Sequence, residues 1–347
     1  MFERVFKLSE HKTTVKTEVM AGITTFMTMA YILAVNPSVL GSTGMDTTAV
    51  LLATALASCL GTLCMAFMAN LPFALSAGMG LNAFMAYTVV AGYGYSWQVA
   101  LLAVFIEGLI FIVLSLTNIR EAIFNAIPLT LKKGVSVGIG LFIAFIGLQN
   151  SGLCVDSATL VGIISFPENF HTAGICALLT LIGLFFTAVF YARKMKGAIL
   201  YGILLTWILG MLCQVTGLYV PTPDAGFYSL FPSWGMTDFS KLGLTFGQCF
   251  NVDFSAVGIV NFIVVIFSFL FVDIFDTLGT LIGVATKAKM LDKDGKLPGI
   301  KPALLADSIA TSAGAILGTS TTTTFVESAS GVAVGAERTS AEQPSCP

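Results

Sequence analysis

Three apolar stretches of this sequence contain carboxylic acids where hydrocarbon side chains would be expected. Asp273 and Asp276 lie in FSFLFVDIFDTLGTLIG, Glu327 lies in GTSTTTTFVES, and Glu107 lies in VALLAVFIEGLIF. An ionised acid in the nonpolar interior of a membrane costs at least roughly 2.5 kcal/mol, so it should face a cavity or a partner. Such a group can exchange a proton, and its oxygens can accept hydrogen bonds from the N–H groups of a ligand. The residue types therefore indicate proton binding and ligand recognition.

The two aspartates belong to a polar helix face. At about 100° per residue, Asp273, Asp276, Thr277 and Thr280 fall on one side of a helix. One of the aspartates could instead pin a neighbouring helix, and Asp273 is the stronger candidate for that structural role. Glu107 has no polar companions nearby in the sequence. Structural anchoring and function therefore stay equally open for it.

Two of the apolar segments contain residues that weaken a helix. LPFALSAGMGLNAFMAY includes Pro72, Gly78, Gly80 and Asn82, and GTSTTTTFVESASG includes a run of threonines. Backbone that is not helical is tolerated at membrane depth only where protein or a water-filled cavity satisfies it. We therefore predict that both segments are broken, half helix and half extended chain. Interrupted segments at corresponding positions of two halves are typical of inverted-repeat transporters, which hold the substrate where the breaks meet.

The second interrupted segment suggests a position for Glu327. If the break falls near residues 318–324, Glu327 lies at the start of a half-helix. Free backbone N–H groups and the positive end of the helix dipole would then stabilise its carboxylate. A ligand that has both ring-nitrogen acceptors and N–H donors would match such a site.

The composition places these segments in a membrane. The 347 residues are 56% hydrophobic and only 10% charged, and their mean hydropathy is +0.90. A water-soluble protein could not bury so many apolar side chains in its core. The charged N-terminal stretch does not have the features of a removable signal peptide. The seven cysteines form no C-x-x-C pair and the two histidines lie far apart, so we expect no metal site, disulfide framework or cofactor. The net charge of -2 gives no indication of nucleic-acid binding.

About ten apolar segments are each near the roughly 20 residues that a helix needs to cross a bilayer. Basic residues favour cytoplasmic loops. Of the 17 Lys and Arg residues, all except Lys241 and Arg338 fall on one side if the segments alternate. We therefore predict a multi-pass protein of the plasma or inner membrane with a cytoplasmic N-terminus. The segments lie near 19–40, 49–69, 71–90, 97–117, 133–150, 174–192, 197–218, 257–283, 302–317 and 319–334.

Four motifs, in their order and spacing, resemble the azaguanine-sensitive (AzgA-like) purine permeases, which are related to the nucleobase/cation symporter 2 group. The motifs are TTFMTMAYILAVNP, SAGMGLNAF, FVDIFDTLGTLIG and GTSTTTTFVESASGV. The resemblance runs from about residue 1 to residue 335. It implies an all-α polytopic membrane protein with a uracil-transporter-like fold. That fold has fourteen spans in two inverted seven-span repeats, of which about ten would be present here, with spans three and ten broken by short extended segments.

The resemblance also implies a division into bundles. The expected parts are a core bundle (spans one to four, 1–118), a gate bundle (spans five to seven, 119–218), an extracytoplasmic connection (219–256), the continuation of the core (spans eight to ten, 257–335) and an aberrant tail (336–347).

The same resemblance implies a transporter and no enzyme activity, with proton-coupled uptake of hypoxanthine, guanine or adenine. The family's span-eight acid, which is followed by x-x-Gly, falls on Asp276. Its span-ten acid falls on Glu327 and its span-three polar site on Asn82. The expected partners are a purine nucleobase, a proton and the lipid bilayer, and a homodimer is possible. Our substrate-binding candidates are Asp276, Glu327, Asn82, Thr25, Gly80 and Thr324, and our proton-coupling candidates are Asp276, Glu327 and Asp273.

Other interpretations stay open. After span ten the family continues into four more helices, whereas this sequence reads GAERTSAEQPSCP, so we expect a truncated or frameshifted version. A nonfunctional fragment is one alternative. A transporter of another small solute, or a channel, on the same fold is another, although two facing carboxylates would repel an anion. An intramembrane aspartyl protease is disfavoured because its two aspartates would here lie on one helix.

Overall fold

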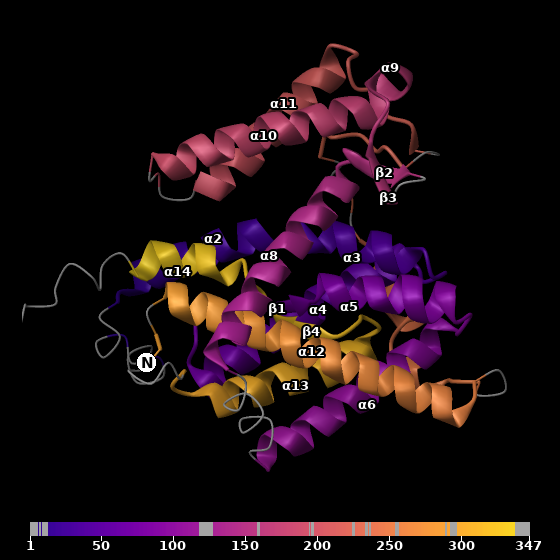
Figure 1. Ribbon diagram of the computed structural model, residues 1–347, viewed down its shortest axis with the longest axis vertical. Helices are drawn as coiled ribbons and strands as arrows, with labels where there is room; N and C mark the ends of the chain where they lie inside the picture. The colour runs from indigo at the N-terminus through magenta and orange to yellow at the C-terminus, as the bar shows by residue number, and fades with distance from the viewer. Residues whose placement is uncertain are drawn as a thin grey trace, which may run out of the picture. The chain divides into compact units, whose positions relative to one another are not determined.

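The computed structural model is mostly helical (Figure 1). In its described part, six helices are long and apolar enough to cross a membrane. The chain is therefore a multi-pass membrane protein. Each of the ten predicted segments contains helical residues, and the third and tenth also contain extended chain. The number of spans and the arrangement in two inverted repeats stay predictions. The structure describes residues 6, 8, 13–117, 128–157, 160–193, 195, 198–223, 226–232, 235, 237–253, 257–288, 290–291 and 297–336.

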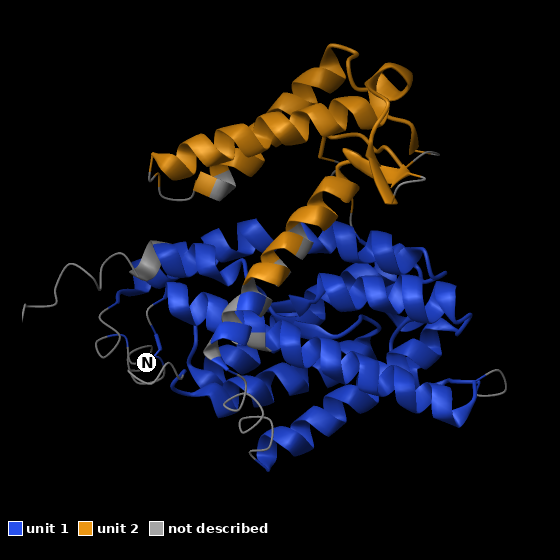
Figure 2. Ribbon diagram, in the orientation of Figure 1, with its two compact units in different colours: residues 1–136, 237–347 blue, residues 137–236 orange. Residues whose placement is uncertain are grey.

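The chain forms two compact units, which Figure 2 colours separately. Unit 1 comprises residues 1–136 and 237–347, and unit 2 comprises residues 137–236. Segment 219–256, which we expected to form one connection, contributes to both units. The assignment of core and gate roles to particular residues stays a prediction.

Unit 1 is built from long helices and several short ones. The first predicted span is divided at Ala30 and Tyr31 into two helices, and Pro37 lies inside the second of them. The longer helices are α2 (Val15–Met29), α3 (Ile32–Gly41), α4 (Thr47–Cys64), α6 (Trp97–Leu116), α12 (Ile259–Lys287) and α13 (Ile300–Leu317). The shorter ones are η1 (Met65–Ala69), α5 (Met79–Ala83), η2 (Phe84–Gly92), η5 (Phe239–Leu244), η6 (Gln248–Phe250) and α14 (Ser328–Ala336).

Two short strands pair where the third and tenth segments meet, and we refer to this strand pair as the strand crossing. Strands β1 (Leu75–Ala77) and β4 (Thr322–Thr324) pair antiparallel, with Leu75 opposite Thr324. Two flanking bonds extend the ladder: the Gly78 N–H donates to the Thr321 carbonyl at 2.9 Å, and the Phe325 N–H donates to the Ala74 carbonyl at 2.9 Å. This pairing satisfies the hydrogen-bonding groups of backbone that is not helical. Both predicted interruptions are confirmed, and each strand precedes a short helix.

Gly318 is the residue at which the tenth segment leaves its preceding helix. It follows the last residue of α13 and has φ of 100°, in the left-handed region that glycine adopts without strain. Its N–H donates to the Gly314 carbonyl at 2.9 Å, which closes the end of the helix. From this turn the chain runs extended into β4.

Long helices of unit 1 surround this strand crossing. Helix α6 packs against α12 and α13, and β1 and β4 contact α4, α12 and α13. The apolar core includes Leu81, Met85, Val104, Phe111 and Phe269, all fully buried. The crossing therefore lies within a packed helical unit and not in a surface loop.

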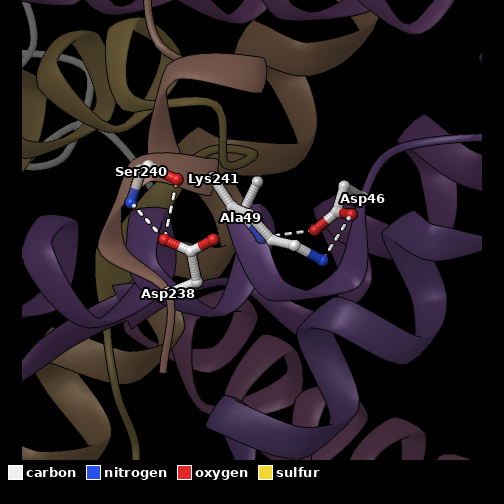
Figure 3. A network of polar contacts seen from close by, with 5 residues as sticks. All are labelled: Asp46, Ala49, Asp238, Ser240 and Lys241. Atoms are coloured by element: carbon white, nitrogen blue, oxygen red, sulfur yellow. Dashed lines mark hydrogen bonds and ion pairs between the residues drawn. The ribbon is translucent and has the colours of Figure 1, made fainter. Parts of the chain in front are cut away.

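An ion pair joins the second part of segment 219–256 to the start of α4 (Figure 3). Asp46 accepts a hydrogen bond from the Ala49 N–H at 2.9 Å, and its other oxygen lies 3.3 Å from the Lys241 Nζ. The Ala49 hydrogen bond and the Lys241 charge lower the pKa of Asp46 from its ordinary value. In the same stretch Asp238 accepts from the Ser240 N–H at 3.0 Å. These contacts fix η5 against α4.

Unit 2 contains two long antiparallel-packed helices and a hairpin that the sequence did not predict. Helices α10 (Ile175–Ala192) and α11 (Ala198–Val215) approach closely, with Gly183 against Thr206 and Gly202 against Thr187. Strands β2 (Cys154–Ser157) and β3 (Leu160–Ile163) form the hairpin, and most of α8 (Leu129–Asn150), α9 (Phe166–Asn169) and η3 (Phe170–Gly174) complete the unit.

Candidate functional site

The hydroxyl groups of residues 319–323 hold the extended part of the tenth segment in place. Thr319 accepts a hydrogen bond from the Asn36 Nδ2 at 2.8 Å, and the Thr321 hydroxyl donates to Glu107 at 3.0 Å. The Ser320 hydroxyl donates to the Asn82 Oδ1. All six residues from Thr319 to Thr324 are almost fully buried. The run of hydroxyls thus replaces part of the hydrogen bonding that a continuous helix would supply.

Glu327 lies directly before α14 and contacts the first predicted span. The Tyr31 hydroxyl donates to the Glu327 Oε1 at 2.7 Å. Tyr31 lies between α2 and α3, and both residues are partly accessible. Thr28, in α2, precedes Tyr31, and Ser330, in α14, follows Glu327. The hydroxyls of Thr28 and Ser330 lie 2.9 Å apart. The carboxylate is therefore oriented by a phenol at a point where α2 and α14 pack together.

Asp276 faces the start of the other short helix. A Cβ placed on Gly78 would lie 3.3 Å from the Asp276 Oδ2 and 2.9 Å from the Thr323 Cγ2. Gly78 is the residue directly before α5, so the carboxyl group lies beside the first turn of that helix. Asp276 is close enough to Asp307 and Glu327 for their charges to interact with its own. The absence of a side chain at Gly78 permits this approach.

The Thr277 hydroxyl connects a second pair of carboxyl groups. Its Oγ1 lies 3.1 Å from the Asp273 Oδ1, 3.2 Å from the Asp307 Oδ2 and 3.0 Å from the Thr323 Oγ1. Asp273, Thr277 and Asp307 are fully buried. A hydroxyl has one proton to donate, so it can serve only one of these acceptors at a time. This cluster ties α12 and α13 to strand β4.

The two short helices differ in what their first turns offer a ligand. For the N–H groups of Met79, Gly80 and Leu81 in α5, no acceptor is recorded among the described residues. In α14, by contrast, the N–H groups of Ser328, Ala329 and Ser330 donate to the carbonyls of residues 325–327. The prediction that Glu327 lies at the start of a half-helix is confirmed. The prediction of free N–H groups beside it is wrong, because a tight turn takes up those donors.

The remaining predicted site residues occupy different positions around the crossing. Asn82 is fully buried, and within the described chain its Nδ2 has no recorded acceptor. Gly80 lies in the first turn of α5 and is half-buried. Thr324 pairs with Leu75, and its buried hydroxyl has no recorded partner among the described residues. Thr25 lies against Gly331 where α2 packs on α14. Three of these residues therefore belong to the crossing, and Thr25 to an adjoining helix contact.

Tyr31 and Asp307 are functional candidates absent from the predicted site. Thr24, Thr28 and Tyr31 follow one another at i, i+4 and i+7 in the sequence, which is a signal for a shared helix face, but the partner of Tyr31 is 296 residues away. Asp307 lies in a small-residue helix, IKPALLADSIATSAGAIL, in which it is the only acid. An acid within an apolar helix is itself a signal, and by that criterion Asp307 could have been found.

The arrangement combines acceptors and donors within one partly accessible region. Asp276 and Glu327 supply carboxylate oxygens, and the first turn of α5 supplies N–H groups. No group of three or more metal-binding side chains that could hold an ion is found among the residues described. Such a set can accept hydrogen bonds from the N–H groups of a ligand and donate hydrogen bonds to its acceptors.

The sequence is similar to known permeases. The Permease family, which comprises xanthine and uracil permeases, matches residues 16–341. A protein of Methanocaldococcus jannaschii named as a permease is 47% identical over 96% of this chain and 72% of its own length. The guanine/hypoxanthine permease PbuG of Bacillus subtilis is 46% identical over 95% of this chain and 73% of its own length. The adenine permease AdeP of Escherichia coli is 41% identical over 96% of this chain and 70% of its own length.

Proposed function

This chain belongs to the Permease family and is an AzgA-like member of it, and we propose that it takes up purine nucleobases across the cytoplasmic membrane together with protons. Two of the relatives named above are an adenine permease and a guanine/hypoxanthine permease, which makes hypoxanthine, guanine and adenine the substrates to test. Permeases move solutes and catalyse no chemical reaction on them. The chain is accordingly a transporter and not an enzyme.

The observation that carries this proposal is that two carboxyl groups, those of Asp276 and Glu327, lie next to the paired strands β1 and β4. Asp276 approaches Gly78, and Glu327 lies at the far end of β4, held by Tyr31. A purine has N–H groups that donate to carboxylates and ring nitrogens or a carbonyl oxygen that accept hydrogen bonds. In our proposal Asp276 accepts from the purine, and the N–H groups of Met79 and Gly80 donate to it.

Glu327 has a related role at the other end of the substrate. Its Oε1 accepts from Tyr31, and in our proposal its Oε2 accepts from a purine N–H. A hydrogen bond to a charged group contributes roughly 1.5 to 3 kcal/mol, more than one between neutral groups. Hydrogen bonds with Asp276 and Glu327 on opposite edges would orient a flat ring between α12 and α14, and only one of the two acids need be ionised.

Proton coupling follows from the charge balance of the same site. Asp276 and Glu327 are close enough for their charges to interact, and like charges at one site favour one shared proton over two bare carboxylates. A proton that binds with the purine would remove this repulsion. We therefore place proton coupling on Asp276 and Glu327, with Asp273 as a further candidate through its contact with Thr277.

The distribution of basic residues supports a cytoplasmic N-terminus in the plasma or inner membrane. Within this orientation we propose that segments 1–118 and 257–335 form the core that binds the substrate and that 119–218 forms a gate. Labelling of Ser240→Cys by an impermeant thiol reagent in intact cells, without labelling of Lys301→Cys, would agree with this orientation. The reverse pattern would exclude it.

Uptake of radiolabelled hypoxanthine, guanine and adenine into cells that lack purine transporters tests the proposed function. We expect saturable uptake that stops when the proton gradient collapses and is unaffected by removal of sodium. Uptake that survives loss of the proton gradient but requires sodium would exclude proton coupling. No uptake of any purine by well-expressed protein would exclude the function itself.

A further inference from the structure

Helices α10 and α11 of unit 2 pack in a fixed antiparallel register. Three contacts define it, each between a glycine and the residue that faces it on the other helix. The pairs are Thr187 with Gly202, Gly183 with Thr206, and Leu179 with Gly210. Each step of four residues toward the start of α10 is matched by a step of four toward the end of α11. At Gly183 and Gly202 a Cβ would collide with the facing threonine, so the two backbones approach closely there.

The next pair in this register is Cys176 and Cys213. The next residue on a contacting helix face is three or four positions away, and three positions beyond the Leu179–Gly210 pair both residues are cysteines. Both cysteine side chains pack on the same apolar cluster, which includes Tyr219. The Tyr219 N–H donates to the Cys213 carbonyl at 3.0 Å, which fixes the end of α11 beside that cluster. The two thiols are also close enough for a charge on one to act on the other.

Both cysteines lie at the same end of this helix pair. The connection between α10 and α11, at the opposite end, carries three basic residues, and basic residues favour the cytoplasmic side of a membrane. In the proposed orientation Cys176 and Cys213 therefore lie at the extracytoplasmic end, where disulfides form and persist. The structure has both as free thiols that are partly accessible. Their position thus combines proximity, access and an oxidising compartment.

We propose that Cys176 and Cys213 are a modification site, at which an intramolecular disulfide joins the outer ends of α10 and α11 and stabilises unit 2. The oxidant is another disulfide on the extracytoplasmic side. One cysteine thiolate attacks it and releases one of its sulfurs as a thiol, and the second cysteine then displaces the other. One disulfide bond breaks and one forms. Two electrons and two protons pass from the cysteines to the oxidant.

The disulfide acts on unit 2 and not on the candidate substrate site. It closes the loop formed by α10, α11 and their connection, which restricts the unfolded chain and so favours the folded one. Asp276 and Glu327 belong to unit 1. The inference therefore stands or falls independently of purine transport, and its test requires no substrate.

Treatment of the purified full chain with oxidised glutathione tests the proposal. Thiols that stay free are then blocked with N-ethylmaleimide, and the protein is denatured and cleaved with trypsin. Trypsin cuts after Arg193, between the two cysteines, so the peptides 134–193 and 197–241 separate unless a disulfide joins them. We expect these peptides to be linked in most of the protein and to separate on reduction. Tandem mass spectrometry of the linked wild-type peptides identifies the two cysteines without any substitution.

Cys154→Ser is the matched control, because the peptide 134–193 also contains Cys154. The link should persist in Cys154→Ser and be lost in Cys176→Ser. Oxidation should raise the unfolding temperature of wild type and Cys154→Ser by at least about 3 °C and leave that of Cys176→Ser unchanged. Peptides that stay unlinked, with or without bound glutathione, a link through Cys154, or an unchanged unfolding temperature of the linked wild type would each overturn the proposal. Should Cys176→Ser not fold, the cysteines identified in the wild-type peptides decide.

Discussion

At the scale of single residues, Glu327 illustrates how one contact defines a role. Its carboxylate is oriented by Tyr31, 2.7 Å away, at a point where the chain turns from β4 into α14. A glutamate that served only to cap a helix would accept bonds from the first turn of α14. Those N–H groups instead donate to the carbonyls of residues 325–327. These three N–H groups therefore do not bind the Glu327 carboxylate.

We expect Glu327→Gln to lower purine affinity about ten- to a hundredfold, because a charge-assisted hydrogen bond contributes roughly 1.5 to 3 kcal/mol. Tyr31→Phe removes only the orienting bond and should cost about 0.5 to 1.5 kcal/mol of binding free energy. Calorimetric titration of the purified variants with hypoxanthine measures both. If folded Glu327→Gln protein bound hypoxanthine with wild-type affinity, the role of Glu327 would be structural.

The two aspartates of α12 should respond differently to the same substitution. Asp276→Asn should abolish purine binding, because this carboxyl group faces the first turn of α5. Asp273→Asn should mainly lower stability, by about 1 to 3 kcal/mol, because Asp273 is fully buried and bonded to Thr277. Purine affinity and thermal unfolding of both variants are compared at equal protein levels. Equal loss of affinity in both would contradict the assignment.

Sequence reasoning located Asp276 and Glu327 but not Asp307, and it did not identify the partners of these acids. Asp276, Glu327 and Asn82 were predicted, and the structure brings all three to the strand crossing. The Tyr31–Glu327 and Thr321–Glu107 contacts could not be predicted, since 296 and 214 residues separate the partners. Local spacing does not determine which helices pack together. Only the fold determines it.

At the scale of elements, the strand crossing of β1 and β4 depends on Gly78, which has no side chain. Gly78→Ala would place a methyl group 2.9 Å from the Thr323 Cγ2 and 3.3 Å from the Asp276 Oδ2. We expect a stability loss of about 1 to 3 kcal/mol together with weaker purine binding, because the strand and the carboxyl group must move apart.

Gly22→Ala is the matched control for this change. Gly22 lies in α2, and a Cβ there meets nothing within 4 Å. It should leave affinity unchanged and alter stability by less than about 1 kcal/mol. Thermal unfolding and purine titration of both variants measure these effects. Undiminished binding by Gly78→Ala would mean that the crossing is not part of the site.

A second element-scale prediction concerns Asp46 at the start of α4. Because the Ala49 N–H and Lys241 lower its pKa below the ordinary value of 3.8, its ionised form stabilises the folded state. That contribution is complete above the unfolded pKa and is lost as pH falls through the lowered one. Asp46→Asn should therefore be less stable than wild type at neutral pH, with a difference that shrinks below about pH 4. A difference in unfolding temperature that stays constant down to pH 3 would contradict this.

The elements themselves were largely predictable, since glycine, proline and threonine runs mark where a membrane helix breaks. Both interruptions follow from such residues in the third and tenth segments. The β2–β3 hairpin was not predicted, because it lies between two apolar helices and its Leu160 and Ile163 are exposed, at 87% and 76%. Apolar residues with no buried face give no periodic signal.

At the scale of the whole molecule, composition decided the class before any contact was known. A chain that is 56% hydrophobic had to be a membrane protein, and the motifs around its acids indicated a purine permease. The division into two units was less predictable. Residues 219–256 are divided between the two units. Tyr219 packs with α10 and α11 of unit 2, whereas η5 and η6 pack on α4 and α6 of unit 1.

The most direct test of the account is accumulation of radiolabelled hypoxanthine by vesicles that contain this chain and are more alkaline inside than outside. We predict accumulation above equilibrium for wild type, none for Asp276→Asn, and none for wild type when the gradient is collapsed. The central claim would be contradicted if Asp276→Asn accumulated hypoxanthine as wild type does, or if wild-type vesicles accumulated none.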